Sequence, residues 1–175
     1  MPQSGDQDVR TGLAAHLVAL WRFGLVLSGS GQSAEELVQA TCVRALERSH
    51  QFMPGTRLDR WLFAIERSIW LNEIRANKIR NPVELEQAES VLSFDGERQF
   101  ETNILAAQVL RQVQAMPAAL RETVFLVYAE GLSYAEAADM LAVPIGTIMS
   151  RLASARLRLA HLNKDTPEGA AGESS

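Results

Sequence analysis

The 175-residue sequence contains a single cysteine, Cys42, and only three histidines, His16, His50 and His161. One thiol cannot form an internal disulfide bond, and histidines so far apart in sequence do not have the paired spacing of a zinc site. These shortages exclude a disulfide framework and a multi-cysteine zinc site, and they fit a protein of the reducing cytoplasm. We predict no metal and no cofactor.

The sequence also lacks an excess of positive charge, because 17 Lys and Arg residues stand against 21 Asp and Glu, a formal net charge of -4. Domains that bind nucleic acid on their own usually carry a basic excess, so any DNA binding must come from local patches. The most apolar early stretch, residues 13–27, is interrupted by His16 and Arg22 and follows polar residues that include two acids. This pattern predicts neither a signal peptide nor membrane insertion.

Recognisable catalytic motifs are missing as well. Cys42 lies in a helical pattern with an apolar flank and no histidine at contact spacing, which is typical of a small buried hydrophobic residue. The glycine clusters at 28–31 and 169–172 do not form a phosphate-binding loop. We therefore predict that the chain is not an enzyme and has no small-molecule substrate.

Apolar residues recur at helical spacing through much of the sequence. Apolar spacing predicts one helix from about Asp8 to Leu27 and a second that begins at Ser33, with Ser33 as its N-cap and Glu36 as the capping-box partner. A third helix is expected from Leu58 to about Ile79, and Pro82 ends it. No strand-like alternation persists, so the predicted fold class is all-α.

The helices fall into two groups. Residues 82–102 are rich in acids and poor in hydrophobic side chains, which predicts a flexible acidic linker. The linker separates a helical domain at 8–81 from a second helical domain at 103–163. The tail at 164–175 is rich in Gly, Ala, Ser and Glu and is predicted to be disordered.

The second domain has the pattern of a helix-turn-helix unit. A helix is predicted over residues 120–129, followed by a turn and a capping box in which Ser133 begins a short helix and Glu136 reaches back to it. A turn at 142–144 leads into a last helix that begins at Ile145. Two helices joined by a short turn are typical of DNA-binding domains.

The last helix is a basic segment within an acidic chain. No acid occurs between Pro144 and Lys164, whereas four residues after Pro144 are basic: Arg151, Arg156, Arg158 and Lys164. Local positive charge of this kind suits contacts with DNA phosphates. The pattern favours DNA binding over an ordinary helical hairpin whose arginines are solvated.

Three segments, in this order, resemble the extracytoplasmic-function sigma factors of bacterial RNA polymerase. They are Ser33–Gln39, Phe52–Ile65, and Gly131–Ala138 together with Val143–Ile148. The resemblance runs from about Leu13 to Leu162, and the second segment is closest to the general-stress subgroup. It implies a two-domain helical sigma factor that binds core RNA polymerase and promoter DNA, starts transcription at stress-type promoters, and has an anti-sigma factor as a further partner.

The resemblance implies three binding surfaces. The helix that matches residues 33–48 would dock on core polymerase, the segment after Gln51 would open the minus-ten element, and the last helix would read the minus-35 element. Melting requires a pocket for an unstacked base and cations for strand phosphates. The candidates are Glu36, Leu37, Gln39 and Arg44 for polymerase, Phe52, Arg57, Arg60, Asn72, Arg75, Lys78 and Arg80 for the minus-ten element, and Thr147, Ser150, Arg151 and Ser154 for the minus-35 element.

Three apolar residues, Leu37, Trp61 and Trp70, can be interpreted as core residues instead of binding residues. Leu37 is equally well explained as a core residue. Trp61 is predicted to be core rather than a stacking platform for a base, because an aromatic side chain at helical spacing is more often buried. For Trp70 both interpretations stay open.

The sequence also departs from many members of the family. They have an acid at the position of Ala40, a basic residue at Met149, and bulky or basic residues at Ala153 and Ser154. These departures favour an alternative, a sigma-like decoy that binds an anti-sigma factor or polymerase without supporting initiation. Such decoys carry an attached receiver domain, which the sequence does not show. A free-standing helix-turn-helix repressor would leave the motif at 52–65 unexplained.

Overall fold

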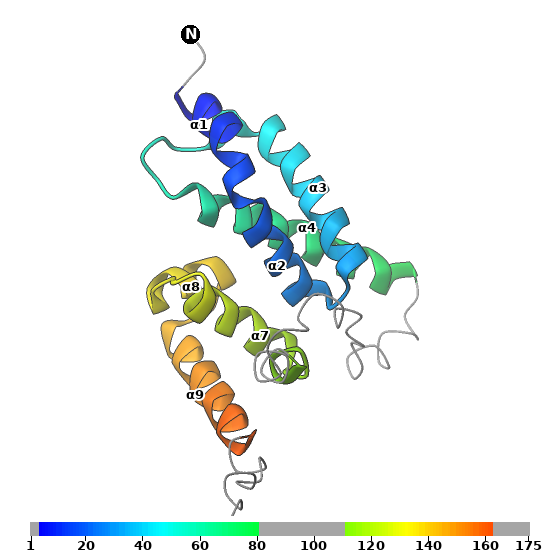
Figure 1. The fold of residues 1–175 in the computed structure, drawn as a ribbon, viewed down its shortest axis with the longest axis vertical. Helices are drawn as coiled ribbons and strands as arrows, with labels where there is room; N and C mark the ends of the chain where they lie inside the picture. Colours follow the sequence, from blue (N-terminus) through cyan, green and yellow to red (C-terminus); the bar gives the residue numbers. More distant parts are fainter. Residues whose placement is uncertain (1–3, 81–110, 163–175) are drawn as a thin grey trace, which may run out of the picture.

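The computed structural model describes residues 4–80 and 111–162, and within these residues the regular structure is entirely helical. The first group contains α1 (Ser4–Gly12), a 3-10 turn η1 (Leu13–His16), α2 (Leu17–Ser28), α3 (Gly31–Glu47), a 3-10 turn η2 (Ser49–Gln51) and α4 (Leu58–Arg80). The second contains α7 (Ala118–Val124), a π-helical turn η4 (Phe125–Ala129), α8 (Tyr134–Leu141) and α9 (Ile145–Leu162) (Figure 1). The predicted all-α fold is confirmed, whereas the predicted linker at 82–102 and tail at 164–175 lie outside the described residues.

The first predicted helix is one helical run with an interruption. The 3-10 turn at Leu13–His16 separates α1 from α2. Because a 3-10 turn has three residues per turn instead of 3.6, it changes which face of the following helix points to the core. Leu20 and Phe23 are fully buried, but Leu17, which has the same spacing in an uninterrupted helix, is 39% exposed.

The predicted N-cap of the second helix was wrong by three residues. Gly29 ends α2 in the left-handed conformation, with φ +70°, and its N–H donates to the Leu25 carbonyl at 2.8 Å. This tight turn places Ser30, not Ser33, at the N-cap of α3, where the Ser30 hydroxyl accepts a hydrogen bond from the Ser33 N–H at 3.3 Å. The Glu36 carboxylate accepts from the Gln32 amide instead of capping the helix.

The helix-turn-helix unit follows the sequence prediction closely. The Ser133 hydroxyl accepts from the Glu136 N–H at 3.3 Å, and the Glu136 carboxylate accepts from the Ser133 N–H at 2.8 Å, so the predicted capping box is confirmed. Ala142 ends α8 in the left-handed region, with φ 55°, and Pro144 then precedes α9. The helix predicted over 120–129 is α7 continued by the π-helical turn.

The two helical groups pack against each other. Residues of both groups belong to one cluster of buried hydrophobic side chains, and α7 contacts α2 along the interface (Figure 1). Phe125 of η4 inserts between the groups, where its ring stacks on Phe23 of α2 with centroids 5.3 Å apart. It also meets Phe63 of α4 edge-on at 6.2 Å. In the structure the domains are therefore packed rather than splayed.

One helical run in the described residues, Gly5–Ser28, is long and apolar enough to cross a membrane by length and composition. The buried core helix of a globular protein meets the same criterion. In this fold Leu20, Phe23 and Leu27 are buried, and α2 contacts α3, α4 and α7. Protein packing thus accounts for part of the apolar character of this run, whereas Leu17 and Val18 are exposed.

Candidate polymerase and nucleic-acid interfaces

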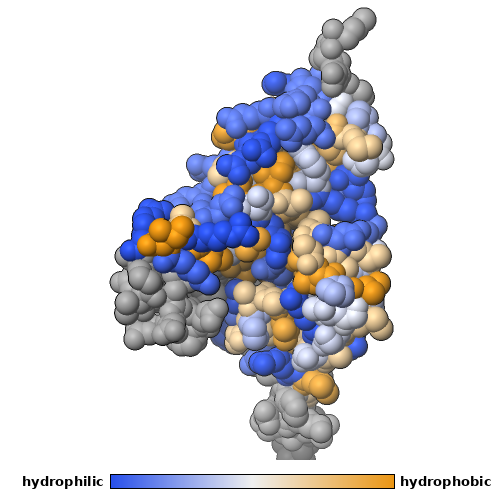
Figure 2. Space-filling model, turned by 180° about the vertical axis from the view of Figure 1, so that it is seen from behind, coloured by the Kyte–Doolittle hydropathy of each residue, from blue (hydrophilic) through white to orange (hydrophobic). Residues whose placement is uncertain are grey.

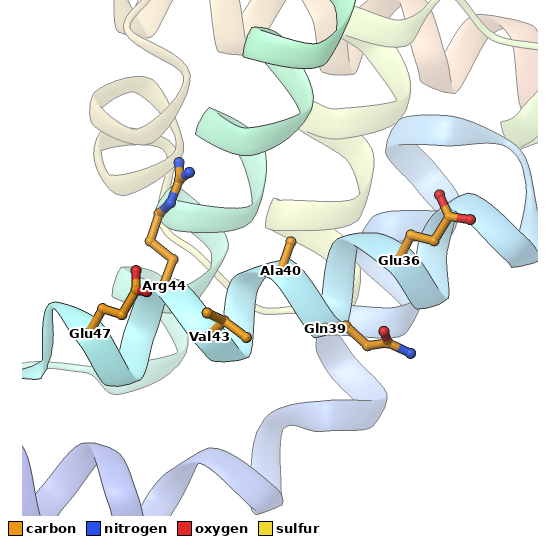
Figure 3. Close-up of a pocket in the computed structure, with 6 residues that line it drawn as sticks. All are labelled: Glu36, Gln39, Ala40, Val43, Arg44 and Glu47. Atoms are coloured by element: carbon orange, nitrogen blue, oxygen red, sulfur yellow. The ribbon is translucent and has the colours of Figure 1, made fainter.

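Helix α3 has one packed face and one exposed face. Its buried side chains recur at helical spacing and face the core: Ala34, Leu37, Thr41 and Ala45. Leu37 is 1% exposed, so the structure corrects its assignment to the polymerase surface and supports the core alternative. A shallow surface hollow on the other side is lined by residues from α3 alone: Glu36, Gln39, Ala40, Val43, Arg44 and Glu47 (Figure 3).

The hollow on α3 combines charge of both signs with apolar surface. Glu36 and Glu47 lie at its two ends, Arg44 lies between them, and Val43 is 56% exposed. Three of the four predicted polymerase contacts, Glu36, Gln39 and Arg44, line it together. An exposed apolar side chain framed by charges is typical of a protein-binding surface rather than of a small-molecule pocket.

The loop before α4 has one buried residue, Phe52, whereas residues 53–57 are exposed. Phe52 is 5% exposed, and its ring lies 5.4 Å from that of half-buried Trp61. Phe52, a candidate contact for the minus-ten element, is therefore packed against Trp61 rather than exposed. Half-buried Trp61 packs against the core as predicted, and half-buried Trp70 does so too.

Two arginines of this segment already have carboxylate partners. The Arg57 Nε donates to Asp59 at 3.1 Å, and this hydrogen bond raises the pKa of the Arg57 guanidinium. Arg60 forms an ion pair with Glu136, which belongs to α8 in the second domain. Both cations are thus engaged by protein carboxylates in the structure.

The C-terminal half of α4 is different, because its polar side chains are open to solvent. Four of the predicted contacts are exposed here, Asn72, Arg75, Lys78 and Arg80, together with Glu73, Asn77 and Ile79. Asn72, Arg75 and Lys78 follow one another at three-residue spacing and form a single stripe. The Asn72 amide oxygen accepts a weak hydrogen bond from Arg75 at 3.4 Å. This stripe has the charge and the accessibility that phosphate contacts require.

Helix α9 also separates into two faces. Ile148, Leu152 and Ala155 are fully buried against the rest of the second domain. The four predicted minus-35 contacts lie away from this packed face, with Ser150 and Ser154 exposed and Thr147 and Arg151 half-buried. Their polar groups are hydroxyls and a guanidinium, which can donate to base edges or phosphates in a groove.

The surface beside these contacts is not uniformly polar. Ile145 is 50% exposed and Met149 is 54% exposed, so two apolar side chains near the start of α9 are open to solvent. The face of the molecule in Figure 2 is likewise a mosaic of hydrophilic and apolar side chains. On this face, hydrophilic side chains thus alternate with apolar ones rather than forming one continuous polar surface.

Comparison with known proteins identifies the family. Residues 13–79 match the family model Sigma-70 region 2, and residues 106–159 match Sigma-70, region 4. The chain is 32% identical over 155 residues to the ECF RNA polymerase sigma factor EcfG of Rhodopseudomonas palustris (strain TIE-1), a match that covers 89% of this chain and 84% of that protein. This chain belongs to the ECF RNA polymerase sigma factors. It is a DNA-binding regulator of transcription initiation and not an enzyme.

Other relatives support the assignment of this sigma factor. It is 34% identical over 137 residues to ECF RNA polymerase sigma factor SigC of Mycobacterium tuberculosis (strain CDC 1551 / Oshkosh), covering 78% of this chain and 73% of SigC. Its fold is similar to that of the sigma factor RpoE from Bartonella quintana, solved with the anti-sigma factor NepR, at a TM-score of 0.74 and 30% identity over 92% of this chain and 99% of RpoE. CnrH, solved with the cytosolic domain of CnrY, shares the fold at a TM-score of 0.64 and 22% identity.

Region 2 of this sigma factor holds a buried acid that the sequence analysis missed. Glu66 of α4 is fully buried, and neither carboxylate oxygen has a hydrogen-bond partner. Burial raises its pKa from the ordinary value of 4.5 to about 9, so the side chain is neutral at physiological pH. Its burial could have been predicted from helical spacing, since Glu66 lies on the same face of α4 as Leu62 and Ile69.

Cys42 and the other ligand-type side chains give no sign of a metal centre. No group of three or more His, Cys, Asp or Glu side chains within residues 4–80 and 111–162 is placed to hold a metal ion. Cys42 is half-buried, and burial raises the pKa of its thiol. A protonated thiol is a weak nucleophile and a weak ligand.

Proposed function

We propose that this sigma factor directs core RNA polymerase to stress-type promoters in the cytoplasm, by reading the minus-35 element with region 4 and melting the minus-ten element with region 2. One observation carries this proposal. The candidate contacts for polymerase, melted DNA and duplex DNA lie on three separate exposed surfaces, formed by α3, the C-terminal half of α4, and α9. Helices α3 and α9 keep their opposite faces in the core, and α4 is anchored by the buried residues of its N-terminal half.

The α3 hollow is suited to the polymerase contact. Glu36, Gln39 and Arg44 can pair with charges of either sign, and Val43 adds an apolar anchor at the centre. Ala40 occupies the position where many relatives have an acid, which widens the hollow and removes one charge. The proposed docking therefore depends on Arg44 and the two glutamates more than on a continuous acidic face.

The stripe on α4 is suited to single-stranded promoter DNA. Arg75, Lys78 and Arg80 are exposed cations at the end of a helix, where the side chains can reach backbone phosphates. Each phosphate that a protein cation neutralises makes binding more sensitive to salt. The proposed melting surface consequently runs along α4 beyond the loop in which Phe52, Arg57 and Arg60 are already engaged.

Helix α9 is suited to the major groove. Recognition helices contact base edges mainly through their N-terminal residues, and in α9 these include Thr147, Ser150 and Arg151. The Ser150 hydroxyl donates to the Thr147 carbonyl at 3.0 Å, which leaves its lone pairs free to accept from a base amino group. With one arginine among the four candidates, the proposed readout depends strongly on hydroxyl groups.

An anti-sigma partner and a stress-type regulon belong to the same proposal. The supporting observations are the resemblance of residues 52–65 to the general-stress subgroup and the 30% identity to RpoE, which was solved in complex with NepR. No described surface identifies the inducing signal. The anti-sigma factor is proposed to bind surfaces that this sigma factor would otherwise present to polymerase or promoter DNA.

Promoter melting tests the proposal at the α4 stripe. Holoenzyme is assembled with purified core polymerase and mixed with a selected promoter that carries 2-aminopurine in the minus-ten element, whose fluorescence rises on unstacking. The double variant R75A/K78A is expected to reduce melting at least tenfold, whereas R10A/R48A, which also removes two exposed arginines, leaves it unchanged. Equal melting by both variants would contradict the assigned surface, and no melting by the wild-type protein would contradict the function.

A further inference from the structure

The exposed face of α9 carries two adjacent rows of residues that differ in chemistry. Residues four apart in sequence are neighbours on the surface of a helix. The first row, the apolar row, has four exposed members at this spacing: Ile145, Met149, Ala153 and Leu157. The second row, the polar row, lies one residue further along and is also exposed: Gly146, Ser150, Ser154 and Arg158.

The apolar row lies outside the protein core. Ile145, Met149 and Leu157 are 50%, 54% and 66% exposed, whereas Ile148 and Leu152 on the packed face of α9 are fully buried. Single exposed apolar side chains are normal on a protein surface, but several that adjoin one another mark a binding surface. The apolar row therefore points to a ligand that offers apolar groups.

The charge of α9 favours DNA as this ligand over a protein partner. The helix contains three arginines and no Asp or Glu, although the chain as a whole has a formal net charge of -4. A basic helix of this kind is complementary to the phosphate backbone. Because the apolar row borders the polar row on the same exposed face, one ligand can cover both rows.

The first two turns of α9 expose no arginine. Recognition helices contact base edges mainly through their N-terminal residues. Over residues 145–152 the exposed residues are two apolar residues, a glycine and a serine: Ile145, Gly146, Met149 and Ser150. Arg151 is half-buried, and Arg156, further along, donates from Nη1 to the Tyr128 hydroxyl at 2.9 Å. An exposed arginine for bidentate contact with guanine is thus missing from the segment where base contacts are expected.

Thymine is the base that matches such a surface. All four bases present hydrogen-bonding groups in the major groove, and thymine adds a methyl group at C5, which apolar side chains contact in direct readout. A methionine side chain is flexible and adapts to irregular apolar surfaces. A Cβ added to Gly146 would have no atom within 4 Å, so the backbone beside the apolar row is open to close approach by DNA.

We propose that Ile145, Met149 and Ala153 read thymine methyl groups in the minus-35 element, so that this sigma factor selects A·T pairs opposite the apolar row. The inference rests on the proposed function, because it assigns a base chemistry to the same minus-35 surface. Met149 holds the central position among the three residues. Leu157 lies two turns beyond Met149, about 12 Å along the helix axis, and is outside the reading segment.

Removal of single methyl groups from the DNA tests this proposal. Holoenzyme assembled with core polymerase first selects promoters from a library randomised over the minus-35 region. Each thymine of the selected element is then replaced in turn, on both strands, by deoxyuridine, which lacks the methyl group and keeps every hydrogen-bonding group. In competition binding, the wild-type holoenzyme is expected to lose affinity about fourfold at one or more thymines, equivalent to ~0.8 kcal/mol for one buried carbon group.

The M149A variant shows whether the lost affinity comes from this side chain. At the thymine that Met149 contacts, M149A is expected to bind the thymine and uracil duplexes equally. An effect of uracil on DNA shape alone would persist in M149A and keep the fourfold ratio. L157A is the matched control, because it also shortens an exposed apolar side chain of α9, and it is expected to retain the fourfold ratio.

The outcomes separate this proposal from the proposed function. Equal affinity of the wild-type holoenzyme for thymine and uracil duplexes, an unchanged ratio in M149A, or a selected element without A·T pairs would overturn the methyl readout and leave minus-35 recognition intact. Weaker binding of M149A to core polymerase with an unchanged ratio would also overturn it, and would assign the apolar row to a protein contact. If no minus-35 sequence is enriched, the proposed function fails and the methyl readout fails with it.

Discussion

Glu66 is a carboxylic acid placed where a hydrophobic residue would be expected. It is fully buried in α4, its oxygens have no hydrogen-bond partner, and a Cβ added to Gly24 would lie 3.0 Å from its Oε1. A buried carboxylate without a partner is strongly unfavourable, so the side chain takes up a proton. Region 2 therefore folds around a neutral acid.

The raised pKa of Glu66 predicts a pH-dependent stability. The unfolded chain releases the proton near the ordinary pKa of 4.5, whereas the folded protein holds it up to about pH 9. The stabilisation is complete below pH 4.5 and is lost as the pH rises toward 9, by about 1.4 kcal/mol per pH unit. The free energy of unfolding of the wild-type protein is thus expected to fall steadily between pH 5 and 9.

E66Q tests this account, because glutamine has the shape of the protonated acid and does not ionise. Its unfolding free energy is expected to vary much less over the same range and to exceed that of the wild-type protein at pH 8. E35Q removes an exposed carboxyl of α3 and should follow the wild-type curve. Urea titrations at several pH values provide the measurement. Parallel curves for E66Q and the wild-type protein would mean that Glu66 is ionised and solvated.

At the residue scale, two of the predicted contacts, Leu37 and Phe52, are buried in the structure. Leu37 shares its spacing with Ala34 and Thr41, and this stripe is what buries it. Phe52 lies in a loop, where no periodicity indicates burial, so only the fold reveals its contact with Trp61. Burial in a loop depends on tertiary neighbours that a local pattern does not contain.

At the scale of helices, the crossing of α2 and α3 depends on a small residue. A Cβ at Gly24 would lie 3.1 Å from the Ala34 Cα and 3.0 Å from Glu66. The first of these neighbours is backbone, which moves only if α3 shifts. Small residues at helix crossings allow close approach of the helix axes, and Gly24 has this role in region 2.

Gly24→Ala is therefore expected to reduce the free energy of unfolding by about 1–3 kcal/mol, because overpacking outweighs the gain in helix propensity. Gly31→Ala is the matched control, since nothing lies within 4 Å of its Cβ position at the start of α3. It is expected to be neutral or to stabilise by up to ~1 kcal/mol. Urea midpoints of the two variants test the prediction, and equal midpoints would contradict it.

The helices themselves were largely predictable, and the exceptions have local causes. The Ser133 capping box and the span of α4 follow from residue type and spacing. The start of α3 was misassigned because Ser30 and Ser33 can both cap a helix, and the left-handed turn at Gly29 decides between them. The 3-10 turn at Leu13–His16 has no distinctive residue, so a continuous apolar pattern concealed it.

At the scale of the whole molecule, the sequence predicted two domains but not their contact. Arg121, Glu122 and Phe125 lie in an amphipathic helical segment, and each is compatible with an isolated domain. Their partners, Val26, Arg67 and Phe23, are at least 55 residues away in sequence. A buried cation that satisfies carbonyls of two domains has no signature in local spacing, which is why the interface could only be found in the structure.

Run-off transcription with purified core polymerase tests the central claim most directly. On a promoter selected by the holoenzyme, addition of this sigma factor is expected to produce transcripts with one defined start site, and core polymerase alone is expected to produce none. Tight binding of the chain to core polymerase or to an anti-sigma factor without any specific transcript would contradict the account, and would instead identify the chain as a sigma-like decoy.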